Sequence, residues 1–498
     1  MSDINLKRMW ILLILAILIS SAVLLTDAFR DDNFCHYDSP FYATISQNIV
    51  NSGDWLNLRY SLDKPVVADH PPLVFWANAL SLKMFGTSVF SVILFSVLCT
   101  IGTCIAVFFI GLVLKNDIAG FFSAMGLLLT RYVPRVARYN TIEIPLMFFV
   151  TLAILFLILA FKKHRAFYLL FGLSAGLAIL SKGVVGMFPL GICFLAIIFQ
   201  GKLRDFYNPL LLAGIVVSLA MPILWFFLKG GMSLAGAKEA LVQYFSFVSS
   251  TFQASGRGES TTVLRLITQL FEICFIIIPG VVLGVYFTVR ESMREKRKDY
   301  FSIFLWIVIF VAAFSISSWR RGFYLLPMYP AMAILFGIGL NEVLPVRYRM
   351  YTVYLVIAFF AGNISAPFLF PHWEPKSIGE VVYENTYLPK VKKVINAIFA
   401  QSPEKIKLVS YHPKSPKEDE FIFFFRSDYN IELCRSSDEF RQLAVSRVPV
   451  LFHISKHDFS QVDKTLHNKL KIIYAYSDQL LVTNDMSLVP VFDIADSK

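Results

Sequence analysis

Charged residues are scarce in this 498-residue sequence. Asp, Glu, Lys and Arg together make up 16% of the chain, against about 25% in ordinary soluble domains. Hydrophobic residues make up 56%, and the mean hydropathy is +0.61. A chain of this composition has too little polar surface to cover a water-soluble core. The composition therefore excludes a soluble enzyme and a disordered chain, and it predicts a polytopic membrane protein.

Cysteine is scarce as well, with six residues in the whole chain, which excludes a disulfide scaffold. Cys35 and Cys434 are candidates for an oxidising compartment, although sequence alone does not pair them. The other four fall inside apolar segments and are predicted to be packing residues: Cys99, Cys104, Cys193 and Cys274.

What the sequence has in quantity is long apolar runs. About eleven of them are long enough to cross a bilayer core of about 30 Å as helices. The first, at residues 9–25, follows Lys7 and Arg8 and is not followed by the small-residue cleavage site of a signal peptide. The others lie at 87–114, 118–131, 143–161, 166–181, 183–200, 208–228, 264–289, 301–317, 323–341 and 351–370. The predicted fold is an all-α polytopic membrane protein.

The net charge of +11 has the sign expected of a nucleic-acid-binding protein. Most basic residues lie beside apolar runs, however, so we expect no nucleic-acid partner.

Basic residues indicate which helix ends face the cytoplasm. With a cytoplasmic N-terminus, the basic loops fall inside, as the positive-inside tendency requires: Lys115, residues 162–165, Lys202 with Arg204, residues 290–298, and Arg347 with Arg349.

The loop 29–86, the segment 229–261 and the tail 374–498 then fall outside. The segment 229–261 is either a mobile lid or a helix in the membrane interface. In the tail, charged residues become frequent and short apolar runs alternate with turn signals. Strands are predicted at 405–411, 421–425, 448–453 and 471–476, and helices near 377–400 and 436–445. We therefore expect a transmembrane domain over residues 1–373 and a small external α/β domain over 374–498.

Several cations lie at external helix ends, where the positive-inside tendency should deplete them: Arg131, Arg135, Arg138, Lys182, Arg320 and Arg321. Any one of them is accounted for by a side chain that extends along the apolar surface to pair with lipid phosphates. As a set, they favour an external anionic ligand at the level of the membrane surface.

The first external loop carries the acidic candidates. Apolar residues at 41, 45 and 49 predict a short interfacial helix, which Gly53 ends. Asp38 precedes this helix and is either its N-terminal cap or a functional carboxylate. Two prolines at 71 and 72 open a second helix, and Asp69 and His70 beside them are either surface residues or residues that line a site.

Five sequence blocks, in order, carry a resemblance to a known family. They are FYATISQNIVNSGDW after Asp38, DHPPLVFWANALSLKMFG from Asp69, ARYNTIEIPLMFF around Glu143, LSKGVVGMFPL around Lys182 and RRGFYLLPMYPAMAILFGIG from Arg320. Over about residues 9–342 the chain resembles the lipid-linked-sugar glycosyltransferases of the GT-C class. Within that class it is most similar to the bacterial branch with aminoarabinose transferase and the protein O-mannosyltransferase-like enzymes.

The resemblance implies a membrane enzyme that moves a sugar from a polyprenyl (undecaprenyl) phosphate to a hydroxyl or phosphate of lipid A, another glycan or a protein. The reaction would take place on the external face of the bacterial inner membrane, with the C-terminal domain in the periplasm. Asp38 matches the family's catalytic base and Glu143 its partner acid. Lys182, Arg320 and Arg321 match the family's cations, and Tyr324 is expected to line the site with Asp69 and His70.

Two residues depart from the family's pattern. Ser39 stands where a second acidic residue is usual, and His70 stands where many aminoarabinose transferases have lysine. His36 and His70 also lack a recognisable zinc spacing. We therefore expect no cofactor and no resident metal, with a divalent cation as the minor alternative, and the sugar and acceptor stay open.

The chemistry explains the residue types. An acceptor hydroxyl must lose its proton as it attacks the anomeric carbon, which requires a carboxylate such as Asp38. The departing phosphate gains charge, which Arg138, Lys182, Arg320 and Arg321 are suited to hold. A transporter or flippase is the alternative function, but it predicts ionisable residues near the bilayer midplane and an inverted repeat. A membrane-anchored binding protein that works through its tail is a third hypothesis.

Overall fold

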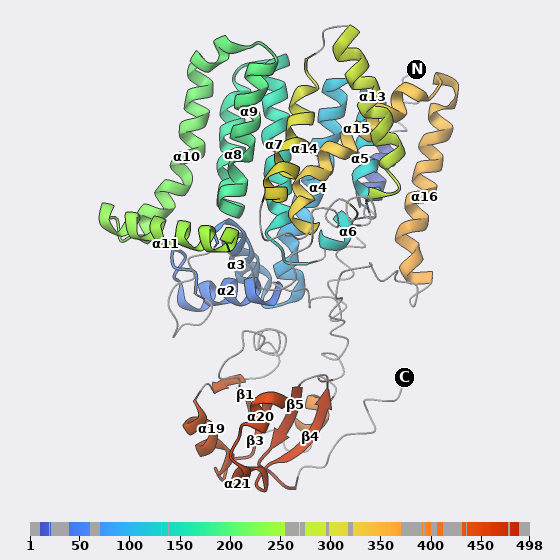
Figure 1. The fold of residues 1–498 in the computed structure, drawn as a ribbon. Coiled ribbons are helices and arrows are strands. Elements are labelled where there is room, and N and C mark those ends of the chain that lie inside the picture. The colour runs from blue at the N-terminus through green and yellow to red at the C-terminus, as the bar shows by residue number, and fades with distance from the viewer. Residues whose placement is uncertain are drawn as a thin grey trace.

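The computed structural model of the chain shows a bundle of long helices and, after it in the sequence, a small α/β unit (Figure 1). The predicted fold class, an α-helical polytopic protein with a small C-terminal α/β domain, is confirmed. The residues that the structure describes are 10–18, 20, 39–59, 70–130, 132–137, 139–253, 268, 274–294, 298–316, 322–369, 391, 394–399, 406–411, 431–434, 436–476 and 479–487.

Five helical stretches among the described residues are long and apolar enough to cross a membrane. They are α4 (Val89–Leu114), α7 (Glu143–Lys162), α8 to α9 (Phe167–Lys182 and Phe188–Phe199), α10 (Pro209–Lys229) and the stretch Phe323–Val343 with α15 (Tyr329–Val343). Shorter apolar helices include α5 (Asp117–Leu129), α14 (Phe301–Ile316) and part of α16 (Arg349–Leu369). The chain is a multi-pass membrane protein.

Small residues let the helices approach closely. On α8, a Cβ atom added to Gly172 would lie 2.0 Å from the backbone oxygen of Gly214 on α10. On α13 (Ile278–Arg294), Gly284 meets the backbone of Leu335 on α15 in the same way. Because lipid tails are as apolar as the helices, such close packing is a main source of association between helices in a membrane.

Charged residues join the loops at one end of the bundle. Lys115 pairs with Glu291, and with Glu342 at 2.9 Å, while Lys162 pairs with Asp299 at 3.0 Å. Lys115, Lys162 and Glu291 belong to segments predicted to be cytoplasmic. The pairs join the ends of α4, α7, α13 and α15 at the end of the bundle that is uppermost in Figure 1. The remaining short helices near this end are η3 (Leu203–Tyr207) and η5 (Val346–Tyr348).

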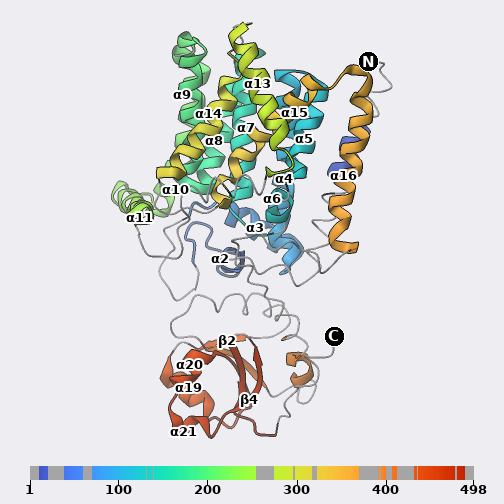
Figure 2. The ribbon, with the colours of Figure 1, turned by 45° about the vertical axis from the view of Figure 1, so that its right-hand side comes forward.

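The opposite end carries α2 (Ser39–Ser52), α3 (Leu73–Phe85), α6 (Tyr132–Ala137) and α11 (Leu234–Gln253). Helices α2 and α11 lie across the long helices (Figures 1 and 2), as interfacial helices do. Gly53 ends α2 with φ +71° and donates its amide to the oxygen of Ile49 at 2.9 Å, as the sequence predicts. The described part of the segment 229–261 contains the helix α11, and both alternatives for this segment, a mobile lid and an interfacial helix, stay predictions.

The α/β unit is a five-stranded sheet in the order β2-β1-β3-β5-β4. Strands β1 (Lys407–Tyr411), β2 (Ile431–Cys434) and β3 (Val450–Ser455) are parallel, and β5 (Gln479–Thr483) is antiparallel to β3 and β4 (Lys471–Tyr476). Residues 394–399 cover one face, and α19 (Ser437–Ala444) covers the other. The short helices α20 (Lys456–Ser460) and α21 (Lys464–His467) link β3 to β4.

The predicted strands near 405–411, 448–453 and 471–476 correspond to β1, β3 and β4, and the predicted helix at 436–445 is α19. Strands β2 and β5 were not predicted. The predicted strand at 421–425 lies outside the described residues, as does most of the predicted helix at 377–400.

Candidate functional site

A buried ion pair joins two helix ends on the side of α2 and α3. Glu143 is the first residue of α7 and Lys182 the last of α8, and Lys182 Nζ lies 2.6 Å from Glu143 Oε1. The two side chains are 6% and 18% exposed. A helix N-terminus favours a negative charge and a C-terminus a positive one, so each charge stands where its own helix stabilises it.

Tyr324 brings a third segment to this pair. It belongs to η4 (Gly322–Met328), and Lys182 Nζ lies 4.2 Å from the centre of its ring, within the range of a cation–π interaction. Helix α14 holds η4 in place, because the indole of its Trp306 donates to the backbone oxygen of Pro327 at 2.8 Å. Three of the sequence blocks therefore meet at Lys182.

Two buried asparagines connect this region to the first external loop. Asn78 of α3 donates its amide to Asn140 Oδ1 at 2.7 Å, and Asn140 donates to the backbone oxygen of Ser39 at 3.2 Å. Asn140 stands three residues before Glu143, and Ser39 is the first residue of α2. The start of α2 is thus bound to the segment that leads into α7.

His70 lies against α2. Its Nε2 is 3.2 Å from the hydroxyl of Tyr42, and its ring stacks on Phe75 with 6.4 Å between the ring centres. Tyr42 and Phe75 belong to the apolar cluster that packs α2 and α3 against the ends of the long helices. The structure therefore places His70 beside α2 and α3, at the end of the bundle that carries these two helices.

Five of the predicted site residues lie outside the described residues: Asp38, Asp69, Arg138, Arg320 and Arg321. Four of them directly precede a described residue of this region in the sequence. Asp38 precedes Ser39, and Asp69 precedes His70. Arg138 precedes Tyr139, and Arg321 precedes Gly322 of η4.

The described residues contain no group of three His, Cys, Asp or Glu side chains that could hold a metal ion. Glu143, the one predicted acidic site residue that the structure describes, has an ammonium group as its partner.

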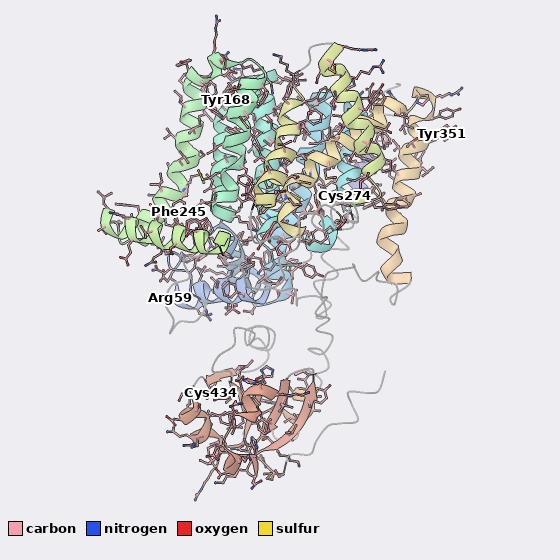
Figure 3. The ribbon with its side chains drawn as sticks, viewed as in Figure 1. Arg59, Tyr168, Phe245, Cys274, Tyr351 and Cys434 are labelled. Carbon is pink, nitrogen blue, oxygen red and sulfur yellow. The ribbon has the colours of Figure 1, made fainter. Side chains whose placement is uncertain are left out.

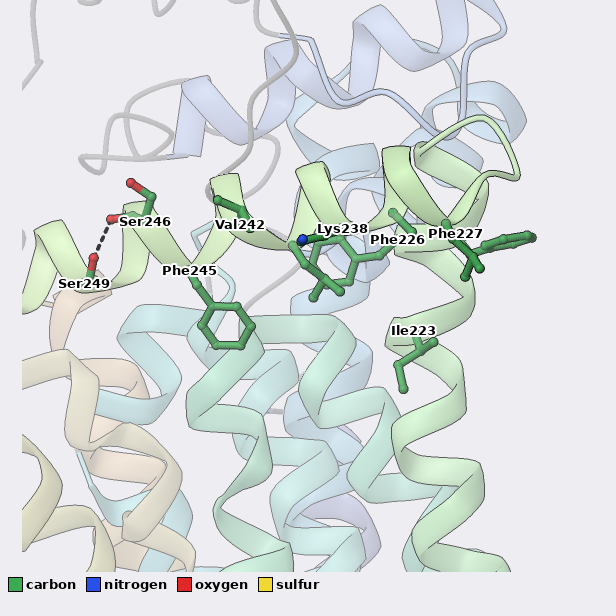
Figure 4. A pocket seen from close by; sticks show the side chains of 11 residues that line it. Ile223, Phe226, Phe227, Lys238, Val242, Phe245, Ser246 and Ser249 are labelled. Carbon is green, nitrogen blue, oxygen red and sulfur yellow. Dashed lines mark hydrogen bonds between the residues drawn. The ribbon is translucent and has the colours of Figure 1, made fainter.

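An apolar groove lies between α10 and α11 (Figure 4). Its volume is about 760 Å³, and its walls include Ile223 and Phe227 of α10 and Leu241, Val242 and Phe245 of α11. These walls suit a hydrocarbon chain. The groove lies beside the interfacial helix and does not include Glu143 or Lys182.

The sequence reasoning missed Asn78, Asn140 and Tyr244 as parts of this region. Asn78 and Asn140 are 1% and 0% exposed. For Asn78, an amide at an otherwise apolar helix position was the available signal, because buried amides need partners. Tyr244 carried no such signal, since its contact with the turn after Lys182 spans 60 residues.

Comparison with known proteins shows which proteins this chain is similar to. Residues 69–227 match the family described as dolichyl-phosphate-mannose-protein mannosyltransferase. The undecaprenyl phosphate-α-4-amino-4-deoxy-L-arabinose arabinosyl transferase 2 of Proteus mirabilis is 24% identical over 315 residues, which are 60% of this chain and 54% of that protein. The match thus spans about half the length of this curated relative.

Solved structures show the same fold. The crystal structure of ArnT from Cupriavidus metallidurans bound to undecaprenyl phosphate aligns with a TM-score of 0.72 at 17% identity, over 96% of this chain and 99% of that one. The apo Archaeoglobus fulgidus oligosaccharyltransferase aligns with a TM-score of 0.52 at 11% identity, over 97% of this chain and 75% of that one. The resemblance seen in the sequence is confirmed: over part of its length the chain is similar to polyprenyl-phosphate-sugar glycosyltransferases of the GT-C class, and it shares their fold.

Proposed function

We propose that the protein transfers a sugar from a polyprenyl phosphate to an acceptor on the external face of the bacterial inner membrane, with residues 374–498 in the periplasm. The observation that carries the proposal is the meeting of Glu143, Lys182 and Tyr324 at the helix ends opposite the basic loops. The tail of a polyprenyl phosphate lies in the bilayer and its phosphate lies at the membrane surface. In the proposed topology the Lys182 ammonium lies at that surface, where it can bind the phosphate.

Lys182 is suited to hold the phosphate of the donor. An ammonium group has three donors, and in the described structure one of them bonds Glu143. A phosphate oxygen can take another, in a largely buried site where a charge-assisted bond is strong. Glu143 orients the lysine, and the ring of Tyr324 limits its movement. Arg138, Arg320 and Arg321 supply further positive charge in this proposal.

Asp38 acts as the base in the proposed reaction. The acceptor oxygen attacks the anomeric carbon, the bond from that carbon to the phosphate oxygen breaks, and the phosphate leaves with the electron pair. The proton of the acceptor passes to the Asp38 carboxylate. The attachment of Ser39 to Asn140 supports this role, because Ser39 follows Asp38 and Asn140 leads to Glu143.

The location of the described ion pair favours a transferase over a transporter. Glu143 and Lys182 stand at helix ends, whereas transporters place ionisable residues near the bilayer midplane. Lipid A, another glycan and a protein all stay open as acceptors, because the matched relatives' names include both a lipid-linked aminoarabinose transferase and a protein mannosyltransferase.

Mass spectrometry of the cell envelope tests the proposal. Lipids and proteins are compared between cells with the protein, cells without it, and cells with Lys182→Met. We expect one sugar-bearing species to be lost without the protein and strongly reduced with Lys182→Met. An envelope with identical glycosylation in the presence and absence of the protein would overturn the proposed function.

A further inference from the structure

The chain reverses sharply after Lys182. Gly183 has φ +53°, a left-handed conformation that favours glycine. The chain then folds back, and a Cβ atom on Gly186 would lie 2.2 Å from the backbone oxygen of Ala178. The position of Lys182 at the end of α8 therefore depends on the shape of this turn.

Tyr244 of α11 touches the turn directly. The Val184 amide donates to the hydroxyl oxygen of Tyr244 at 3.2 Å, and a Cβ atom on Gly183 would lie 1.5 Å from that oxygen. The hydroxyl thus fills the space above Gly183 and satisfies the next amide in the chain. Glycine is needed at 183 both for its backbone conformation and for this contact.

Tyr244 lies on the buried side of α11, where a neighbouring ring of α10 packs against it. Tyr244 is 6% exposed, and its ring packs against Phe226 of α10 with 5.6 Å between the ring centres. Phe245, the next residue, is 54% exposed and lines the α10–α11 groove (Figure 4). Helix α11 therefore places Tyr244 against the turn beside Lys182 and Phe245 in the α10–α11 groove.

We propose that Tyr244 is a positioning residue for Lys182. Its hydroxyl holds the Gly183–Val184 turn, and through that turn it keeps the Lys182 ammonium between Glu143 and Tyr324. The inference rests on the proposed function for one point, the assignment of Lys182 to the phosphate of the donor. It adds that the interfacial helix α11 sets the geometry of that lysine.

A positioning role has a specific kinetic consequence. Lys182 must meet the charge that develops on the departing phosphate, and an interaction that strengthens in the transition state acts on kcat more than on KM. A misplacement of about 1 Å near a reacting centre can cost on the order of 100-fold in rate. Loss of the Tyr244 hydroxyl should therefore lower kcat, with little change in the KM for the sugar-linked donor.

The test is Tyr244→Phe with Tyr168→Phe as the matched control. Tyr168 lies at the other end of the bundle (Figure 3) and donates its hydroxyl to Asp205 at 2.8 Å, so its variant also loses one inward-facing hydroxyl. Both full-length proteins are assayed with the undecaprenyl-phosphate-linked sugar that envelope mass spectrometry identifies. Binding of undecaprenyl phosphate and thermal unfolding are measured alongside.

We expect Tyr244→Phe to lower kcat by about 10- to 100-fold, with the KM for the sugar-linked donor changed by less than about threefold. Tyr168→Phe should keep the wild-type kcat. The double variant Tyr244→Phe/Lys182→Met should be no slower than Lys182→Met alone, because residues that act as a unit are not additive. Wild-type kcat in Tyr244→Phe, or an additive loss in the double variant, would overturn the inference.

The same series separates this inference from the proposed function. Wild-type transfer by Lys182→Met would refute the role of Lys182 itself. A slow Lys182→Met with a fully active Tyr244→Phe would leave the proposed function in place and refute only the positioning role. If Tyr244→Phe fails to fold, Gly183→Ala supplies the second variant, and its transfer should be lost because the added Cβ displaces the same hydroxyl.

Discussion

The ammonium of Lys182 lies 2.6 Å from the carboxylate of Glu143, although the two residues are 39 positions apart in the sequence. The contact joins the first residue of α7 to the last residue of α8. It also removes most of the water from both charges, since neither side chain is more than 18% exposed. Several measurable consequences follow from this pair and the groups around it.

Glu143→Gln should destabilise the protein because it leaves the Lys182 charge without its counter-charge. Removal of one partner from a buried ion pair costs about 3–5 kcal/mol, and the retained amide hydrogen bond should bring the loss toward the lower figure. Thermal unfolding in a fixed detergent measures the effect. Asp299→Asn, in the more exposed pair with Lys162, should cost less.

The double variant Glu143→Gln/Lys182→Met sharpens this prediction. It removes both charges, so it should be more stable than Glu143→Gln alone, although its transfer should be strongly reduced, as in Lys182→Met. A double variant that is less stable than either single one would show that the pair is not the source of the effect.

Asn140→Ala should reduce both stability and transfer. Asn140 is fully buried, accepts from Asn78 and donates to Ser39, and each buried polar group left unpaired costs about 1–3 kcal/mol. Asn341→Ala is the control, because Asn341 is 2% exposed on α15 and bonds Glu342 at the other end of the bundle. The Asn341→Ala variant should lose stability and keep wild-type transfer. An equal loss of transfer in both variants would contradict the placement of Asn140 at the site.

Arg320→Ala and Arg321→Ala should each impair use of the donor. Two adjacent guanidinium groups suit phosphate oxygens better than lysine does, and each lost charge-assisted hydrogen bond should cost about 1.5–3 kcal/mol. Steady-state kinetics with the donor checks the prediction. Arg347→Ala, at the basic end of the bundle, should do little. Unchanged donor kinetics in both external variants would make these arginines lipid anchors.

The Cys434 thiol should resist labelling at neutral pH. Burial raises its pKa to about 12 from an ordinary value of 9.0, so the folded protein holds it as the unreactive thiol. In a variant that retains only this cysteine, maleimide labelling should begin with the unfolding of the sheet in urea. The contribution of the protonated thiol to stability is complete below pH 9 and is lost as the pH rises toward 12. Rapid labelling of the folded protein at pH 7 would contradict the buried position.

The parts of the fold that local patterns determine were predictable. Apolar runs indicated the long helices, and the spacing of Phe41, Ile45 and Ile49 indicated α2, because side chains four positions apart share a helix face. Gly53 marked the end of α2 for the same local reason. Strands β2 and β5 were missed because their pairing depends on neighbours elsewhere in the chain.

The candidate site was predictable as a set of residues and not as a geometry. Sequence blocks pointed to Glu143, Lys182 and Tyr324, but only helix packing shows that the first two form an ion pair over which the third lies. Tyr244 was out of reach, because nothing around it in the sequence indicates a contact with Val184. Long-range contacts of this kind arise from the packing of α8, α10 and α11.

The central claim is sugar transfer from a polyprenyl phosphate with Asp38 as the base. Its most direct test is the reconstituted full-length protein with the identified donor and acceptor, in which release of undecaprenyl phosphate and appearance of the sugar on the acceptor are measured together. The account predicts equal amounts of both products for the wild type, and neither for Asp38→Asn in a protein that remains folded. Near wild-type turnover by Asp38→Asn, or no transfer by the wild type, would contradict it.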